Sequence, residues 1–301
     1  MSHEARAGFL QDELQNFEEI ARYLNPSPGE IPALSGVDIG GLFLPLRGVI
    51  GGDHVIYIDF NKRYDLDARI AETERGRQKK VAERLHGLKS RAGILVADVS
   101  GHRITDALIA AMLHQAFLLG AFYELDLFGE ITTRIFEHIN TRFHRTTSFH
   151  KFLTMIYGEI SDEGKFRFIS AGHPPPAVFS REYERFMAIS KELLVSFPPV
   201  GMFPSRNDPD ARRYRSRYGY KENYAVNEIK LLSPGDILLL YTDGLSEHAQ
   251  GEFFPGAVER LLGASAHLPA SGICERLRHE LLALAEPHDD ISVVVIKKNP
   301  Q

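Results

Sequence analysis

The chain has 301 residues, 44% of them hydrophobic and 25% charged, which is ordinary for a globular protein. Its net charge of -5 gives no basis for nucleic acid or an anionic membrane as the partner. The single cysteine, Cys274, excludes an intrachain disulfide and favours a reducing cytoplasm. The longest apolar runs, such as 237–241, are much shorter than the roughly 20 residues that span a bilayer, so we expect no membrane segment.

The first predicted element is an amphipathic helix over residues 4–24, where apolar side chains recur at steps of three and four among acidic neighbours. Pro26, Pro28 and Gly29 end it. Such a helix either lies on its own domain or forms a dimer or regulator contact. We therefore treat 1–30 as a helix with its linker and 31–301 as one domain.

Short β-like runs separated by turns follow from residue 37 onward, and longer helical patterns lie between them. The predicted strands cover 39–44, 55–60, 94–97, 152–160, 166–170, 177–179, 228–232, 237–241 and 291–297. The predicted helices cover 105–125, 127–143, 255–262 and 270–285. Because strands come in runs interrupted by paired helices, the order predicts an α+β fold with an antiparallel β-sandwich rather than a doubly wound sheet.

Two charged segments look inserted into this framework. Residues 67–91 place Val81, Leu85 and Leu88 on one stripe, which suggests a mobile charged helix. Residues 205–222 are rich in arginine and tyrosine. Either segment could dock a phosphoprotein through its charge, and a solvated surface excursion is the alternative.

Four aspartates stand at strand ends or glycine turns: Asp53, Asp98, Asp243 and Asp289. Taken singly, each has an ordinary explanation as a turn or helix-capping residue. Their recurrence at four strand-adjacent turns favours a shared role instead. Carboxylates without cysteine or a recurrent histidine partner are what Mg²⁺ or Mn²⁺ prefers, and several that converge can hold two ions.

A paired metal site suits the hydrolysis of a phosphomonoester. The ions offset the charge of the phosphate and lower the pKa of a water, which can then attack phosphorus without a protein nucleophile. Consistent with this, the sequence has no Gly-x-Ser-x-Gly elbow, no cysteine in a basic anion loop and no Gly-x-x-x-x-Gly-Lys-Ser/Thr loop. The sequence therefore predicts a phosphate-processing metal centre.

The histidines give weaker signals. His173 lies between a predicted strand and a proline run, so it either orients the site or fixes a turn. His102 is a candidate acid for the leaving group, with a surface helix-start residue as the alternative. His54 and His288 flank predicted ligands, but their spacing is not typical of zinc, which leaves them as supporting residues at most.

Together, the motifs resemble the metal-dependent PPM (PP2C-like) serine/threonine phosphatases, in the bacterial SpoIIE/RsbU-type branch. The matching segments occur in family order and span about residues 31–298. They are Gly51-Gly52-Asp53, Val96-Ala97-Asp98-Val99-Ser100-Gly101-His102, Ile169-Ser170-Ala171-Gly172-His173-Pro174-Pro175, Leu232 to Leu245 with Tyr241-Thr242-Asp243-Gly244, and His288-Asp289-Asp290-Ile291-Ser292.

The resemblance implies an α-β-β-α sandwich with helices on both sides and a two-metal site at one edge. Asp53 and Asp98 would bridge or flank the two Mn²⁺ or Mg²⁺ ions, with the Val99 carbonyl as a further ligand. Asp243 and Asp289 would complete one metal shell. Asp290 is a lesser candidate. The implied substrate is a phosphoserine or phosphothreonine protein, often a STAS-type anti-anti-sigma factor in partner-switching systems.

This chain departs from the family pattern at three places. His102-Arg103 stands where Lys-Gly is usual, a second aspartate soon after Asp53 is replaced by Ile56, and the charged segment 67–91 lengthens a connection. The predicted ligands are intact, so these differences bear on substrate choice and regulation.

We thus predict a cytoplasmic phosphoprotein phosphatase that uses a metal-activated water, with a possible homodimer through the N-terminal helix. The alternatives are a pseudophosphatase that binds a phosphoprotein without turnover, and a hydrolase of small phosphoesters, because metal ligands do not encode the leaving group.

Overall fold

The structure is a computed structural model that describes residues 3–26, 28–46, 51–101, 104–146, 151–210, 213, 216 and 219–300. It contains two five-stranded sheets, and every strand pairing in them is antiparallel. The first sheet has the order β1 (Val37–Leu44), β10 (Ile291–Lys298), β9 (Ile237–Tyr241), β6 (Ala177–Ser180) and β7 (Arg185–Phe186). The second has the order β2 (Asp53–Asp59), β3 (Arg91–Val99), β4 (Leu153–Ser161), β5 (Lys165–Ala171) and β8 (Asn227–Lys230).

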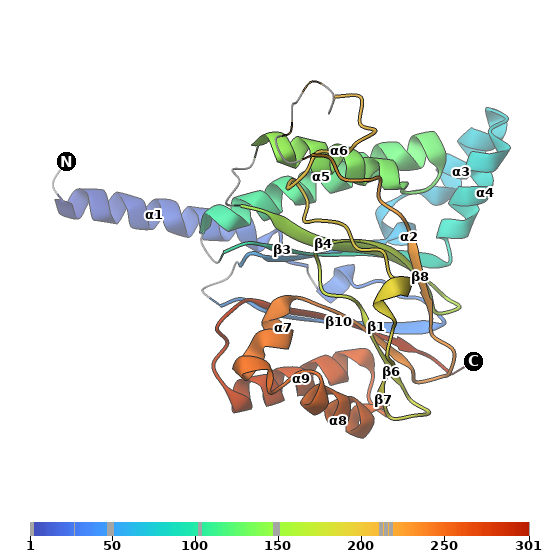
Figure 1. Cartoon of the computed structure of the whole chain (residues 1–301). Helices are drawn as coiled ribbons and strands as arrows, with labels where there is room; N and C mark the ends of the chain where they lie inside the picture. The colour runs from blue at the N-terminus through green and yellow to red at the C-terminus, as the bar shows by residue number, and fades with distance from the viewer. Residues whose placement is uncertain are drawn as a thin grey trace.

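The two sheets pack face to face, and helices cover both outer faces (Figure 1). One outer layer consists of α2 (Phe60–Arg63), α3 (Leu66–Arg75), α4 (Lys79–Leu88), α5 (Ile104–Phe128) and α6 (Thr133–Thr146), on the second sheet. The other consists of α7 (Asp243–Glu247), α8 (Gly256–Ser265) and α9 (Ala270–Leu284), on the first sheet. The predicted α-β-β-α sandwich is confirmed.

Three hydrophobic clusters hold these layers together, and they follow from the alternation of side chains along each strand. On β3, Ile94 and Val96 face the first sheet and join the central cluster between the sheets. Their neighbours Leu95 and Ala97 face α5 and α6. Because the middle strands are covered on both faces, they read in the sequence as nearly continuous apolar runs.

Helix α5 corrects the expectation that no segment is long and apolar enough to cross a bilayer. Residues 106–128 pass that test by length and composition, and a third of the tested window is buried inside the protein. Scattered polar residues such as His114 and Glu124 interrupt every apolar run in this helix, which is why the sequence pattern missed it. In the structure, Leu113, Phe117 and Leu125 are fully buried in the core against the second sheet.

The charged segment 67–91 forms two helices rather than one, so the prediction of a single mobile helix is wrong. Helix α3 ends at Gly76, and Arg77 then adopts a left-handed backbone conformation with φ 57° before α4 begins. The predicted apolar stripe is real, because Leu85 and Leu88 are fully buried and Val81 packs beside them. These contacts anchor the hairpin to the core.

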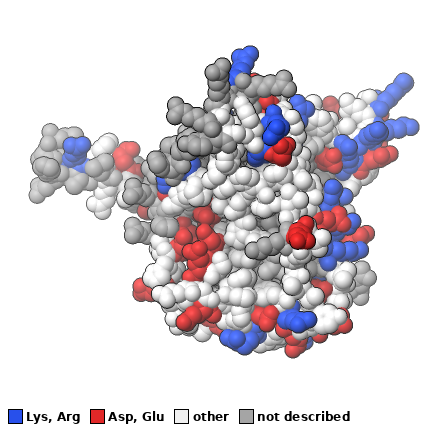
Figure 2. Space-filling model, viewed as in Figure 1, with Lys and Arg blue, Asp and Glu red and all other residues white. Residues whose placement is uncertain are grey.

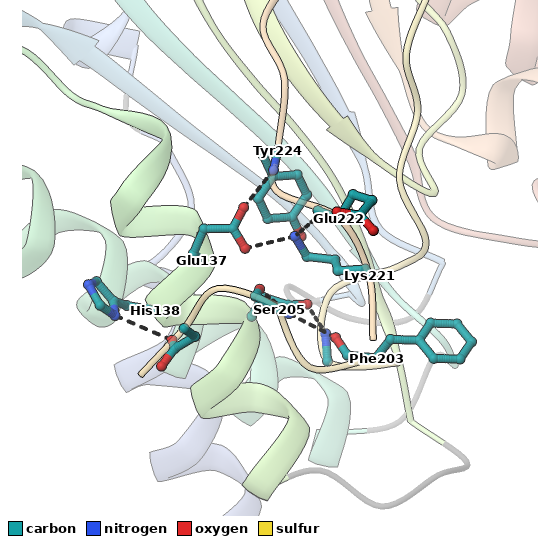
Figure 3. Close-up of polar contacts among 10 residues, drawn as sticks. Glu137, His138, Phe203, Ser205, Lys221, Glu222 and Tyr224 are labelled. Carbon is teal, nitrogen blue, oxygen red and sulfur yellow. Dashed lines mark hydrogen bonds and ion pairs between the residues drawn. The ribbon is translucent and has the colours of Figure 1, made fainter. Parts of the chain in front are cut away.

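The second charged segment, 205–222, is also anchored, at both of its ends. The Lys221 ammonium donates to the Glu137 carboxylate on α6 at 2.8 Å and lies 3.4 Å from the Tyr224 ring centroid (Figure 3). At the other end, the Asn140 side chain on α6 donates to the Ser205 hydroxyl at 3.0 Å. The interpretation as a solvated excursion is therefore wrong for these ends, whereas Arg212, Arg215 and Arg217 lie outside the described residues.

The predicted N-terminal helix is present as α1 (His3–Arg22), and it extends away from the sandwich (Figure 1). Large apolar side chains of this region, including Phe9, Ile20 and Tyr23, are exposed. The division of the chain at residue 30 stays a prediction.

Candidate metal centre

The four predicted aspartates occupy strand ends at one edge of the sandwich. Asp53 begins β2 and lies directly opposite Asp98, near the end of the neighbouring β3. Asp243 follows β9, and Asp289 precedes β10, the strand that pairs with β9. Because antiparallel neighbours bring the end of one strand beside the start of the next, each sheet contributes two aspartates to this edge.

Short hydrogen bonds join the two pairs across the sandwich. The Thr242 hydroxyl, next to Asp243, donates to the Asp53 carboxylate at 2.7 Å and accepts the Ser292 N–H at 3.0 Å. The Asp290 carboxylate accepts the backbone N–H of Gly52 at 2.6 Å. The edge is thus one connected site and not two separate sheet ends.

Asp290 has a different part in this site from the one that its position suggested. Its two carboxylate oxygens accept one backbone N–H each, from Leu46 and from Gly52, both at 2.6 Å. These bonds tie the loop before β2 to the start of β10. The sequence singled out Asp290 as a lesser ligand, whereas the structure shows it holding the backbone next to Asp53.

The glycine pair before Asp53 is required by close backbone contacts. A side chain at Gly52 would place its Cβ 2.6 Å from the Val99 carbonyl oxygen and 2.7 Å from the Gly101 carbonyl oxygen. At Gly51, a Cβ would lie 2.2 Å from the Asp290 carboxylate. Since the Val99 N–H also donates to the Gly52 carbonyl at 3.2 Å, the two loops pack directly on each other and bring Val99 beside Asp53.

Negative charges crowd this edge, where Figure 2 shows acidic side chains gathered at the level of α7. Burial, followed by the carboxylates of Asp243 and Asp289, raises the pKa of Asp98 to about 7. Burial and the Asp98 carboxylate raise the pKa of Asp53 well above its usual value, although the Thr242 hydroxyl opposes this shift. The Asp98 carboxylate therefore interacts unfavourably with those of Asp53, Asp243 and Asp289.

Whether this edge suits a metal ion depends on its donors and on their spacing. Among the residues that the structure describes, no three His, Cys, Asp or Glu side chains come close enough together to hold an ion. The donor types are nevertheless those of a hard cation, namely carboxylates and the Val99 carbonyl. A divalent ion would also offset the burial of negative charge and the repulsion that together raise the pKa values of Asp53 and Asp98, so the donor set fits such an ion.

Two of the candidate histidines are buried in different surroundings. The His173 Nδ1 lies 3.0 Å from the hydroxyl of Thr154, and Thr154 pairs with Asp98 across β3 and β4. The His54 Nε2 lies 2.9 Å from the Nδ1 of His114 on α5. His54 thus faces the helices while Asp53 faces the opposite sheet, so only His173 contacts a strand neighbour of the site.

The charge state of His173 and the positions of His288 and His102 complete the outcomes for the candidate histidines. Burial lowers the pKa of His173 to about 3, which keeps its ring neutral near neutral pH. His288 is exposed. His102 and Arg103 lie outside the described residues, so their predicted effects stay predictions.

Comparison with known proteins identifies the family to which this chain belongs. The family model described as stage II sporulation protein E (SpoIIE) matches residues 89–299. The chain belongs to the SpoIIE family. The part that matches the SpoIIE model contains Asp98, Asp243 and Asp289, and it begins after Asp53.

Two curated relatives come from Bacillus subtilis (strain 168). Phosphoserine phosphatase RsbP is 28% identical over 158 residues, which cover 52% of this chain and 34% of RsbP. Phosphoserine phosphatase RsbU is 22% identical over 216 residues, which cover 70% of this chain and 56% of RsbU. This SpoIIE-family chain thus spans about a third of one relative and little more than half of the other.

Solved structures show the same PP2C fold. The SiaA-PP2C domain of Pseudomonas aeruginosa has a TM-score of 0.63 and 16% identity, with 98% of this chain and 99% of that one covered. The catalytic domain of the serine threonine protein phosphatase PstP, solved with two manganese ions, has a TM-score of 0.51 and 13% identity, with 88% and 98% covered. At these identities the likeness concerns the fold of the SpoIIE-family chain.

Sequence reasoning missed three parts of this SpoIIE-family site. Thr242 was part of a matching motif, but nothing local indicated that its hydroxyl reaches Asp53. The double role of the Asp290 carboxylate depends on backbone groups more than 230 positions earlier in the chain. The ion pair between Lys151 and Asp106, which lies beside the loop after Asp98, gave no motif either.

Proposed function

We propose that this protein is a metal-dependent phosphoprotein phosphatase that hydrolyses phosphoserine or phosphothreonine. The observation that carries the proposal is the gathering of Asp53, Asp98, Asp243 and Asp289 at one edge, where burial, together with repulsion from Asp243 and Asp289, raises the pKa of Asp98 to about 7. A site that accumulates negative charge in this way is suited to a divalent cation rather than to a phosphate by itself.

Each ligand would have a distinct place. Asp53 and Asp98 would bridge or flank a pair of Mn²⁺ or Mg²⁺ ions, with the Val99 carbonyl beside them, and Asp243 with Asp289 would complete one shell. When bound, the ions would offset the charge of the phosphate and supply a water acidic enough to attack phosphorus. Thr242 would hold the Asp53 carboxylate in place, and Asp290 would keep the Gly52 backbone against Val99.

Family and fold support this proposal. The SpoIIE family match covers three of the four aspartates, and both curated relatives carry the name phosphoserine phosphatase. A structure of the same fold holds two manganese ions. Since metal ligands alone do not identify the leaving group, the choice of a phosphoprotein over a small phosphoester rests on these relatives.

The physiological substrate that we propose is a STAS-type phosphoprotein of a partner-switching system, in the cytoplasm. RsbU-type and RsbW-type domains occur together in the solved structure of Rv1364c from Mycobacterium tuberculosis, which supports a partner-switching setting. A panel of phosphorylated STAS proteins, assayed beside unrelated phosphopeptides, tests this choice. Equal rates on both groups would argue against it.

The N-terminal helix α1 supports a proposed homodimer. Phe9, Ile20 and Tyr23 are between 56% and 89% exposed, so the helix offers apolar surface that the described part of the chain leaves uncovered. Deletion of residues 1–24 followed by light scattering tests the dimer. We expect the mass to fall by half, and an unchanged mass would contradict the proposal.

The decisive experiment for the activity is hydrolysis of an aryl phosphate and of phosphopeptides at increasing Mn²⁺, for the wild type and for Asp98→Asn and Asp243→Asn. We expect Mn²⁺-dependent turnover in the wild type and its loss in both variants. Equal rates in all three would disprove the proposed site. Mn²⁺ binding without turnover in the wild type would favour a pseudophosphatase.

A further inference from the structure

The loop that follows Asp98 is attached to the start of β4 by three hydrogen bonds. The Ser100 N–H donates to the Phe152 carbonyl at 3.0 Å, and the Phe152 N–H donates to the Ser100 hydroxyl at 3.1 Å. The Lys151 ammonium donates to the Ser100 carbonyl at 2.9 Å. Ser100 is therefore held at its N–H, its side chain and its carbonyl.

The same lysine also connects this loop to the first turn of α5. Its ammonium lies 2.5 Å from the carboxylate of Asp106, which is fully buried, while the Lys151 side chain is 29% exposed. A Cβ at Gly101 would lie 2.7 Å from both the Asp106 carboxylate and the Lys151 ammonium. Gly101 has φ 116°, a conformation that other residues rarely adopt, so the ion pair packs directly on a backbone that only glycine suits.

Both ends of the loop are therefore fixed relative to the predicted ligands. Asp98 and Val99 precede Ser100 directly, and they pair with Thr154 and Leu153 on β4. Lys151 comes just before that strand. A shift of Asp98, Val99 or Ser100 would therefore break either the β3–β4 pairing or the bond from Lys151 to the Ser100 carbonyl.

We propose that Lys151, through its ion pair with Asp106 and its bond to the Ser100 carbonyl, is a positioning residue that sets the Asp98 and Val99 ligands for metal binding. This inference rests on the proposed metal-dependent function. It assigns Lys151 no contact with the substrate. Its effect is to keep the Ser100 carbonyl turned toward the ammonium. This fixes the Ser100–Gly101 peptide, which follows the peptide that contains the Val99 carbonyl.

Charge and position make opposite predictions for this lysine. A cation near a metal site repels the metal, so loss of the Lys151 charge by itself would tighten Mn²⁺ binding. If Lys151 positions the loop, its loss would instead weaken Mn²⁺ binding, because Asp98 and Val99 would no longer be held in place. The sign of the change in Mn²⁺ affinity therefore separates the two roles.

The test compares the Mn²⁺ dissociation constant, by calorimetric titration, and the kcat and KM for an aryl phosphate in the full chain. The variants are Lys151→Met, which keeps the aliphatic stem, Lys151→Arg, which keeps the charge, and Lys151→Met with Asp106→Asn, which also removes the charge of the buried Asp106 side chain. Lys165→Met is the matched control, because Lys165 also pairs with a carboxylate, that of Glu228 at 3.2 Å, at the far end of the neighbouring strand.

We expect Lys151→Met and the double variant to bind Mn²⁺ at least tenfold more weakly, with Lys151→Arg within about threefold of the wild type and Lys165→Met unchanged. The double variant keeps the test valid if Lys151→Met fails to fold.

Three results would overturn the inference. They are unchanged or tighter Mn²⁺ binding in the folded double variant, a raised KM with an unchanged Mn²⁺ dissociation constant, and an equal loss in Lys165→Met. A wild type that binds no Mn²⁺ would overturn the proposed function together with this inference, whereas a change confined to the variants' KM overturns this inference alone.

Discussion

The carboxylate edge and the contact of Lys221 with α6 both place charged groups in partly or fully buried positions, yet their charges are arranged in opposite ways. At the contact with α6, the Lys221 ammonium faces the Glu137 carboxylate, and the two side chains are 1% and 12% exposed. At the edge, no ion pair that the described residues form includes Asp53 or Asp98. The charges named as acting on them are those of other carboxylates, such as Asp243 and Asp289 on Asp98.

The difference shows which of the two regions serves the fold. A buried pair with satisfied partners holds the backbone beside it in one place, as Glu137 does for Lys221 at the end of the 205–222 segment (Figure 3). A cluster of like charges costs stability in the protein alone, so its presence indicates a function that uses it. The comparison predicts that removing a carboxylate at the edge will lower activity without lowering the stability of the metal-free protein. Breaking the pair at the contact with α6 should instead lower stability.

The largest effect is expected for activity at the carboxylate edge. Asp243→Asn removes a charge from the predicted metal shell and should lower the Mn²⁺-dependent kcat by about 100-fold or more, because the attacking water depends on the bound ions. Steady-state hydrolysis of an aryl phosphate measures it. Asp67→Asn, at an exposed aspartate on α3, is the control and should keep the wild-type rate. Comparable activity in both variants would remove Asp243 from the site.

The next effect concerns stability at the contact with α6. Lys221→Met leaves the Glu137 carboxylate buried without its cationic partner and should lower the free energy of unfolding by about 3 kcal/mol. Urea unfolding measures it, and Glu137→Gln in the same chain should recover part of the loss. Lys230→Met, at an exposed lysine of β8, should change stability by less than about 0.5 kcal/mol. If Lys221→Met lost no more stability than Lys230→Met, the Lys221–Glu137 pair would contribute little to stability.

A smaller effect of opposite sign is expected at Asp53. In the metal-free protein, Asp53→Asn removes a buried carboxylate that Asp98 repels, so the free energy of unfolding should rise by about 1–2 kcal/mol. The same substitution should abolish the stabilisation that the wild type gains from Mn²⁺. Urea unfolding with a chelator and with Mn²⁺ measures both effects. Destabilisation in the chelated sample would contradict the account of repulsion.

The last effect is a pH dependence of stability that comes from Asp98. Its pKa is about 7 in the folded protein and about 3.9 in an unfolded chain. The folded state therefore binds more protons between these values, and the stability of the metal-free protein should fall as pH rises from about 4 to 7. Asp98→Asn should lack this component, so the difference between the two unfolding curves isolates it. A difference that does not vary with pH would contradict the raised pKa.

Much of the fold followed from local patterns in the sequence. The apolar runs at 237–241 and 291–297 predicted β9 and β10 to within one residue, because strands buried on both faces need continuous apolar sequence. The two-residue β7 and the five-residue α7 are too short to show any periodicity. Helices α3 and α4 were read as one because the break at Gly76 and Arg77 lies inside a charged run.

The candidate site likewise has parts that the sequence predicted and parts that it did not. Strand ends and glycine turns indicated where Asp53, Asp98, Asp243 and Asp289 stand along the chain, and the sheets then bring those ends together. The supporting contacts depend on residues that are distant in sequence. Thr242 reaches Asp53 across 189 positions, and Lys151 reaches Asp106 across 45. No local pattern encodes such pairs, so the sequence predicted the ligands but not what holds them.

The most direct test of the central claim is a calorimetric titration of Mn²⁺ into the wild type, Asp98→Asn and Asp67→Asn. If the edge is a metal centre, the wild type and Asp67→Asn will each bind two ions per chain, and the affinities of the two proteins will be the same. Asp98→Asn will lose one of these ions or bind it at least 100-fold more weakly. The same stoichiometry and the same affinity in all three proteins would show that Asp98 holds no metal, and the account given for this edge would be wrong.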